Sequence, residues 1–178
     1  QFTRTINNKP RVVEPPKSFY IFKRGEHYIN EDLDFESGNI LFEPGSLVCI
    51  RKNVTLSFNN SNIILDSDNS HGGVSIKGCN GKGGSVIVKA SSLKIKSLDL
   101  KRLSAPNKNS LGLYAGLNLI NSRVVFDKIT IRESMSEDAI NVVDSQFKGR
   151  VLKFNSISSD GLDSDNSLMK IQNIYCNS

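Results

Sequence analysis

The chain has 178 residues, enough for one domain with a sizeable core but too few for two. Its hydrophobic fraction is 38%, it has no Trp, and its many Asn, Ser, Asp and Gly residues are typical of short strands joined by polar turns rather than of a helical bundle. The net charge of +5 could suggest nucleic acid or another polyanion as a partner, but no aromatic residues interleave with the lysines to support nucleic acid. No apolar run approaches the roughly 20 residues that span a bilayer.

In chain order, residues 1–18 are expected to form an extended N-terminal segment, without the apolar core of a signal peptide. Short apolar runs separated by polar turns then follow at residues 40–42, 47–50, 54–58 and 63–65. Pro44-Gly45 is a favourable pair for a type II turn. Two-residue hairpin signals are nearly absent, and no stretch keeps helical periodicity for three turns. Short strands with few hairpins favour coiling over meandering.

A seven-residue motif then recurs at 116–122, 139–145 and 161–167, so that its copies begin at a nearly constant spacing. Each copy starts with a small residue, has an apolar second residue, and ends in Asn or Asp followed by Ser, as expected for a strand that closes in a turn. Segments 95–100 and 126–131 also resemble each other, and their wider spacing fits one period plus an inserted loop at 104–112. The sequence therefore predicts coils of about 22 residues.

We expect an all-β fold, a right-handed parallel β-helix over residues 19–178, in which each coil stacks on the last at about 4.8 Å. A leucine-rich repeat has a similar period, but its fixed leucine ladder is missing here. No recognisable cap follows the last copy. We therefore expect a fragment of a longer chain, or an end that is covered by further coils or by a partner subunit.

Strand parity predicts which side chains of the repeated motif form the core. Leu117, Ile140 and Leu162 should point inward and stack as one column. The next position in each copy, occupied by Asn118, Asn141 and Asp163, should point outward.

The residues with metal-binding or redox chemistry are sparse. Cys49, Cys79 and Cys176 are far apart and odd in number, so we expect small buried side chains and no disulfide framework. His27 and His71 are isolated, which argues against a metal site or a catalytic triad built on them.

Charge is distributed unevenly along the sequence. Lysines are concentrated between Lys77 and Lys108, and carboxylates become frequent from Glu133 onward. This predicts a molecule that is positive in its middle and negative toward its C-terminal end. Solvated strand faces would give such a pattern, and so would a surface for an anionic polysaccharide or, through the stretch from Lys77 to Lys108, for nucleic acid.

Four segments carry a family resemblance: 25–29 (Gly25 to Ile29), 42–45, 136–141 and 158–163. They resemble bacterial extracellular β-helix proteins of the pectate-lyase-like superfamily, particularly those associated with spore-coat-protein-H-type kinases, over roughly residues 21–178. The resemblance implies a pectin-lyase fold and an extracellular or cell-surface location. It implies little about chemistry, because the superfamily contains polysaccharide lyases, hydrolases, epimerases, tailspikes and adhesins.

The candidate residues for carbohydrate or cation binding are Asp138, Asp160, Asp163, Asn141 and Asn118. Asp138 and Asp160 occupy equivalent places one coil apart, so their repulsion has to be offset by backbone N–H donors, by a raised pKa, or by calcium with Asn141 and Asp163 as further ligands. No other cofactor is expected. Neither the lyase nor the hydrolase pattern can be matched residue by residue, and no catalytic residue is assigned.

Two functions follow from these observations. The leading expectation is a secreted or surface β-helix that serves as a structural or binding module, with polysaccharide as the partner and no nucleic acid. The alternative is a polysaccharide-active enzyme that uses outward carboxylates on adjacent coils. Retaining glycosidases place their carboxyls about 5 to 5.5 Å apart, close to the coil spacing, so Asp138 and Asp160 are compatible with it.

Overall fold

The computed structural model describes residues 18–81, 83–106 and 113–177, and strands make up most of this part of the chain. A single 3₁₀ turn, η1 (Cys79–Gly81), is the one helical element among the described residues. The strands are β1 (Phe19–Phe22), β2 (Gly25–Ile29), β3 (Leu33–Glu36), β4 (Asn39–Phe42), β5 (Ser46–Ile50), β6 (Thr55–Asn59), β7 (Asn62–Leu65), β8 (Val74–Gly78), β9 (Ser85–Lys89), β10 (Ser92–Lys101), β11 (Ala115–Ile120), β12 (Arg123–Arg132), β13 (Asp138–Val143), β14 (Gln146–Asn155), β15 (Asp160–Asp165) and β16 (Leu168–Asn177). The predicted all-β class is confirmed. The expected N-terminal segment lies outside the described residues except for residue 18.

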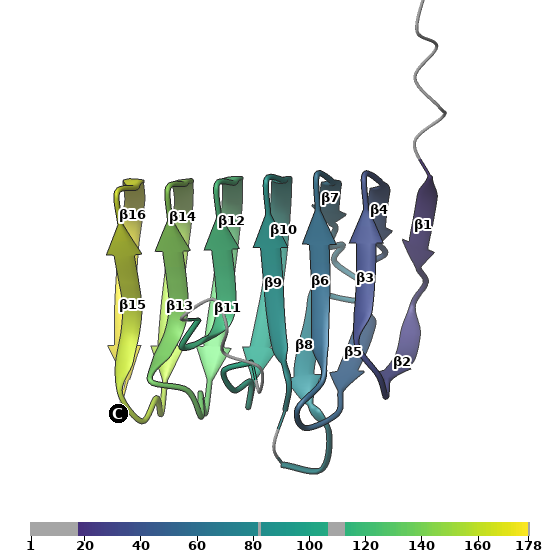
Figure 1. Cartoon of the computed structure of the whole chain (residues 1–178), viewed down its shortest axis with the longest axis horizontal. Helices are drawn as coiled ribbons and strands as arrows, with labels where there is room; N and C mark the ends of the chain where they lie inside the picture. The colour runs from purple at the N-terminus through teal and green to yellow at the C-terminus, as the bar shows by residue number, and fades with distance from the viewer. Residues whose placement is uncertain (1–17, 82, 107–112, 178) are drawn as a thin grey trace, which may run out of the picture.

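The strands form two parallel sheets, and the chain passes from one sheet to the other and back in each repeat (Figure 1). The six-stranded sheet has the order β3-β6-β9-β11-β13-β15. The ten-stranded sheet contains the row β1-β4-β7-β10-β12-β14-β16, and β8, β5 and β2 continue it from the second half of β10. Each strand pairs with its counterpart one repeat along the chain. The arrangement is consistent with a β-helix.

The lengths of the repeats agree with the sequence period. Paired residues of β12 and β14 are 23 residues apart in sequence. Paired residues of β14 and β16 are 22 residues apart. From β10 to β12 the separation is 31 residues, as expected for an inserted loop, of which residues 107–112 lie outside the described part. From β7 to β10 it is 30 residues, because the connections from β7 to β8 and from β8 to β9 are both longer than in the preceding coil, which the sequence did not predict.

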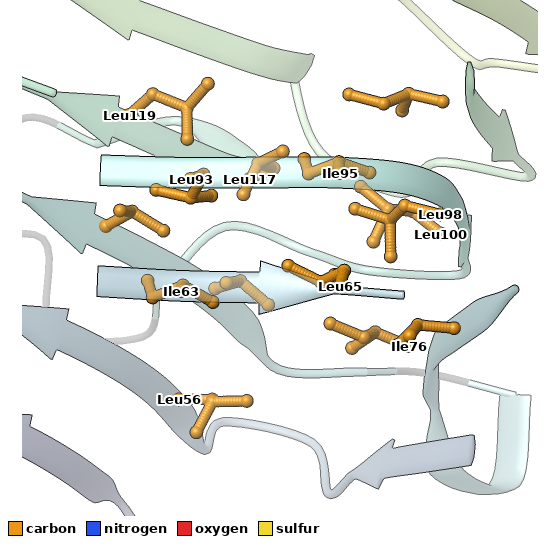
Figure 2. Close-up of a cluster of buried hydrophobic side chains, with 14 of the residues drawn as sticks. Leu56, Ile63, Leu65, Ile76, Leu93, Ile95, Leu98, Leu100, Leu117 and Leu119 are labelled. Carbon is orange, nitrogen blue, oxygen red and sulfur yellow. The ribbon is translucent and has the colours of Figure 1, made fainter. Parts of the chain in front are cut away.

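Columns of inward side chains fill the space between the sheets (Figure 2). Leu117 pairs with Ile140, and Ile140 pairs with Leu162 on the next strand. Leu117 and Ile140 are buried, while Leu162 is partly buried and packs against the core. The predicted column is therefore confirmed, and removing these apolar surfaces from water stabilises the stacked coils.

A sharp corner joins the end of each strand of the six-stranded sheet to the ten-stranded sheet. One residue there has a left-handed backbone, with φ between 45° and 55°, and Asn or Asp tolerates this conformation well. These residues are Ser37, Asn60, Ala90, Asn121, Asp144 and Asn166. The tight corner explains why Asn or Asp recurs near the end of each repeated motif.

A ladder of serines follows this corner. Each serine Oγ accepts a hydrogen bond from the backbone N–H of the equivalent residue in the preceding coil, at 2.9–3.2 Å, and donates to the carbonyl two residues before it, at 2.7–2.8 Å. The ladder consists of Ser61, Ser91, Ser122, Ser145 and Ser167. It satisfies backbone groups where the chain leaves one sheet for the other, and so explains the recurring Ser.

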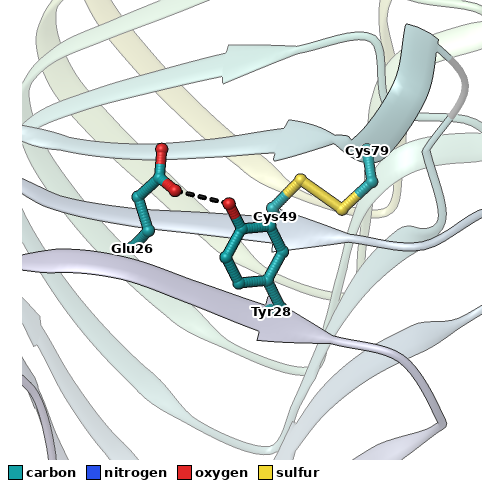
Figure 3. Close-up of a disulfide and its surroundings, with 4 residues drawn as sticks. All are labelled: Glu26, Tyr28, Cys49 and Cys79. Carbon is teal, nitrogen blue, oxygen red and sulfur yellow. Dashed lines mark hydrogen bonds between the residues drawn. A yellow bond between two sulfur atoms is a disulfide. The ribbon is translucent and has the colours of Figure 1, made fainter.

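Two of the cysteines are bonded, contrary to expectation. Cys49 at the end of β5 and Cys79 in η1 form a disulfide that joins neighbouring coils, with their Cα atoms 5.2 Å apart (Figure 3). The prediction failed because the stacking of β5 on β8 brings together two residues that are 30 apart in sequence. Cys176 is free and exposed on β16, the last described strand.

The C-terminal end of the stack exposes part of the inward columns. Ile174 follows Leu152 in register and is 52% exposed, whereas Leu152 is fully buried. β15 and β16 each have one neighbour among the described strands. That further coils or a partner subunit cover this end stays a prediction.

Candidate functional site

The structure brings the candidate residues together on β11, β13 and β15. Asn118, Asn141 and Asp163 lie side by side in register on these three strands. Asp138, the first residue of β13, pairs in the same way with Asp160, the first residue of β15. These pairings confirm the predicted register of the candidate residues. Adjacent parallel strands are about 4.8 Å apart, so residues that pair in this way are close neighbours.

The expected exposure of the two amides is wrong. Asn118 is 0% and Asn141 is 6% exposed, although their parity is opposite to that of the core column. The Nδ2 atom of Asn118 donates a hydrogen bond of 2.7 Å to the Ala115 carbonyl, within the same strand. The Oδ1 atoms of both amides are buried without a hydrogen-bond partner among the described residues. Such an atom destabilises the fold by about 1–3 kcal/mol unless something binds it.

Asp138 is also buried, at 8% exposure, whereas Asp160 and Asp163 are exposed. Burial raises the pKa of the Asp138 carboxyl, and the negative charges of Asp163, Glu137 and Asp160 raise it further. The capping role considered for Asp138 is not seen, because no hydrogen bond from a described residue reaches its carboxyl. Ser136 Oγ instead donates to the Asp138 backbone carbonyl, at 2.5 Å.

The chemistry of this cluster is that of oxygen atoms. Within the described ranges no group of three or more His, Cys, Asp or Glu side chains is placed to hold a metal ion by itself. The two histidines bond locally: His27 Nε2 lies 2.6 Å from the Lys23 carbonyl, and His71 Nδ1 lies 3.1 Å from Asp68 Oδ2. The three carboxylates of Asp138, Asp160 and Asp163 and the two amide carbonyls remain as the groups that could act on a ligand. We call Asp138, Asp163, Asn118 and Asn141 the oxygen cluster.

A second feature, which sequence reasoning missed, is the separation of charge between the two sheets. Strands β10, β12, β14 and β16 carry ten Lys or Arg residues and two Asp, a net charge of +8. The strands of the six-stranded sheet carry six Asp or Glu and one Lys, a net charge of −5. Because each coil contributes strands to both sheets, charge also separates between the sheets, which the distribution along the sequence did not reveal. We call the outer side of β10, β12, β14 and β16 the basic face.

Several cations on the basic face are free to bind an external anion. Ion pairs at 2.6–3.1 Å hold Lys96 to Asp66, Lys101 to Glu133 and Arg132 to Asp99. No salt bridge within the described residues involves the other cations of the face: Lys94, Arg123, Lys128, Lys148, Arg150, Lys153 and Lys170. Lys94, Val125, Lys148 and Lys170 form one row across the four strands. The signal in the sequence was a Lys at the third position of β10, β14 and β16.

An open polar groove of about 490 Å³ borders this row along the serine corner. Its lining includes Asn62, Ser92, Arg123 and Gln146, which lie side by side on β7, β10, β12 and β14. These are the first residues of their strands, two positions before the row that contains Lys94 and Lys148. Amide, hydroxyl and guanidinium groups therefore lie next to ammonium groups, a combination that suits a ligand with both hydroxyls and negative charges.

The basic face offers little for base stacking. On the four strands of the basic face the exposed aromatic side chain is Tyr175, and Lys153 Nζ lies 5.2 Å from the centre of its ring. Phe126, Phe147 and Phe154 of the same strands are buried in the core.

No helix in the described part of the chain is long and apolar enough to cross a membrane. No protein-family model, curated protein or solved structure matches the chain.

Proposed function

We propose that the chain is a right-handed parallel β-helix of the pectin-lyase type that serves as an extracellular or surface binding module for an anionic polysaccharide. The observation that carries this proposal is the basic face, whose four in-register strands carry ten Lys or Arg residues and only two Asp residues. Right-handed winding is supported by the strong preference of parallel crossover connections for that hand.

The ligand class follows from the groups that lie next to each other. The row of Lys94, Lys148 and Lys170 repeats along the stack and suits a polymer with regularly spaced carboxylates or sulfates. The groove beside it supplies hydrogen-bonding groups for sugar hydroxyls. Nucleic acid is less suited, because single strands need stacking rings and duplexes need an element that enters a groove.

The disulfide supports the extracellular location. A bond between Cys49 and Cys79 persists in oxidising compartments and is rare in the cytosol, where thiols are kept reduced. The extracellular or surface location of the chain is therefore proposed together with its binding function.

Binding assays with immobilised polymers test the proposal. Polygalacturonate, alginate and heparin should retain the chain at low salt, and a neutral β-glucan should not. The variant Lys94→Ala/Lys148→Ala/Lys170→Ala should bind roughly 3- to 150-fold more weakly, because each exposed charge pair contributes about 0.2–1 kcal/mol. The control Lys23→Ala/Lys52→Ala/Lys89→Ala removes the same charge from exposed positions outside the basic face and should bind nearly as the parent does.

Three results would contradict the proposal. Equal losses in the two triple variants would show that net charge rather than the basic face attracts the polymer. Tighter binding to duplex DNA than to every uronate polymer would reassign the ligand. Release of new reducing ends or unsaturated uronates during incubation would make the chain a polysaccharide-active enzyme rather than a binding module.

A further inference from the structure

The oxygen cluster contains polar atoms that the fold itself leaves unused. Asn141 is more than nine-tenths buried, and its Oδ1 has no hydrogen-bond partner among the described residues. Asn118, directly beside it on β11, is fully buried with the same deficit. Buried polar atoms in native proteins are normally bonded, so two neighbouring acceptors without partners point to a hydrogen-bond donor or a cation that binds there.

Carboxylates complete the surroundings of these acceptors. Asp163 continues the row of the two amides on β15, and its Oδ1 accepts a hydrogen bond of 2.8 Å from the Ser164 backbone N–H. Asp138 begins β13, the strand that carries Asn141. Asp138 is 8% exposed and belongs to the same buried stretch of β13 as Asn141.

We infer that Asp138, Asn141 and Asp163, with Asn118 beside them, form a binding site for a hard divalent cation, with calcium as the expected ion. The cation would be held by two carboxylates and two amide carbonyls, and water would complete its shell through the exposed side at Asp163. This assignment is independent of the basic face, which lies on the other sheet.

The donor set selects the ion. Calcium takes 6–8 oxygen ligands, uses amide carbonyls readily and tolerates irregular geometry, whereas magnesium requires a near-ideal octahedron. Zinc prefers nitrogen and sulfur ligands, whereas these side chains offer carboxylate and amide oxygens. With two carboxylates the affinity should fall in the range of extracellular calcium modules, about 10⁻⁴ to 10⁻³ M.

Calorimetric titration and thermal melts of the chain, first stripped of metal with chelator, test the site with CaCl₂, MgCl₂ and ZnCl₂ in turn. Calcium at about 100 times its Kd should raise the Tm by roughly 5–10 °C for a domain of this size, and magnesium should act more weakly. Asp163→Asn and Asn141→Ala should each weaken calcium binding at least about 10-fold. Asp163 is exposed, so its variant should fold normally. Asp127→Asn, an exposed acid on the other sheet, should leave calcium binding unchanged.

Other results of the same experiments would overturn the cation site. Superimposable melts with calcium and with chelator overturn the site, and a calcium response that survives both Asp163→Asn and Asn141→Ala places the ion elsewhere. If calcium has no effect while Asp138→Asn stabilises the chain, a protonated Asp138 donates to the amide oxygens, and the cation site is refuted.

Discussion

The core column predicts the cost of removing one fully buried side chain. Ile140→Ala deletes Cγ1, Cγ2 and Cδ1 from a residue that is 0% exposed and lies between Leu117 and Leu162. At about 0.8 kcal/mol for each buried carbon the transfer cost is about 2.4 kcal/mol. The neighbours are held in paired strands and can collapse only partly, so a cavity term should bring the loss of unfolding free energy to about 3–4 kcal/mol.

Leu162→Ala is the matched comparison, because it removes a side chain of similar size from the same column. Leu162 is only partly buried at the open end of the stack, so this variant should lose about 1–2 kcal/mol. Urea unfolding at equilibrium measures both, and the midpoint should fall with an unchanged m value. Equal losses in the two variants, or a larger loss for Asn141→Ala than for Ile140→Ala, would refute the burial and register described above.

Two further predictions concern the serine corner and Asp138. Ser122→Ala leaves the backbone N–H of Ser91 without its acceptor and should lower the unfolding free energy by about 1–3 kcal/mol, whereas Ser92→Ala, at an exposed neighbouring position, should change it by less than about 0.5 kcal/mol in the same urea assay. The folded pKa of Asp138 is raised, so its ionisation destabilises the fold as the pH rises above the usual carboxyl value, near 3.9. In chelator, Asp138→Asn should therefore gain stability over the parent chain as the pH is raised from about 4 to 7, and a difference that does not vary with pH would contradict the burial of the carboxyl.

The strand class, the period and the inward column could all be predicted from the sequence. These features depend on local chemistry that repeats: alternation places Leu117 and Ile140 on one side of their strands, and the Asn-Ser or Asp-Ser ending matches a left-handed residue followed by the serine ladder. The insertion at 104–112 could likewise be located from a break in the period.

The burial of the amides, the cysteine pairing and the charge of each sheet depend on how the coils stack and could not be predicted. Parity correctly placed Asn118 and Asn141 opposite the core column, but the exposure of an outward side chain depends on which other segments lie over it, and both amides are buried. Cys49 meets Cys79 because β5 stacks on β8, which brings together two residues that are 30 apart in sequence. The basic face arises in the same way. Lys94, Lys148 and Lys170 are far apart in sequence and form one row only when the coils stack in register. Stacking places equivalent residues of adjacent coils about 4.8 Å apart, however many residues separate them along the chain.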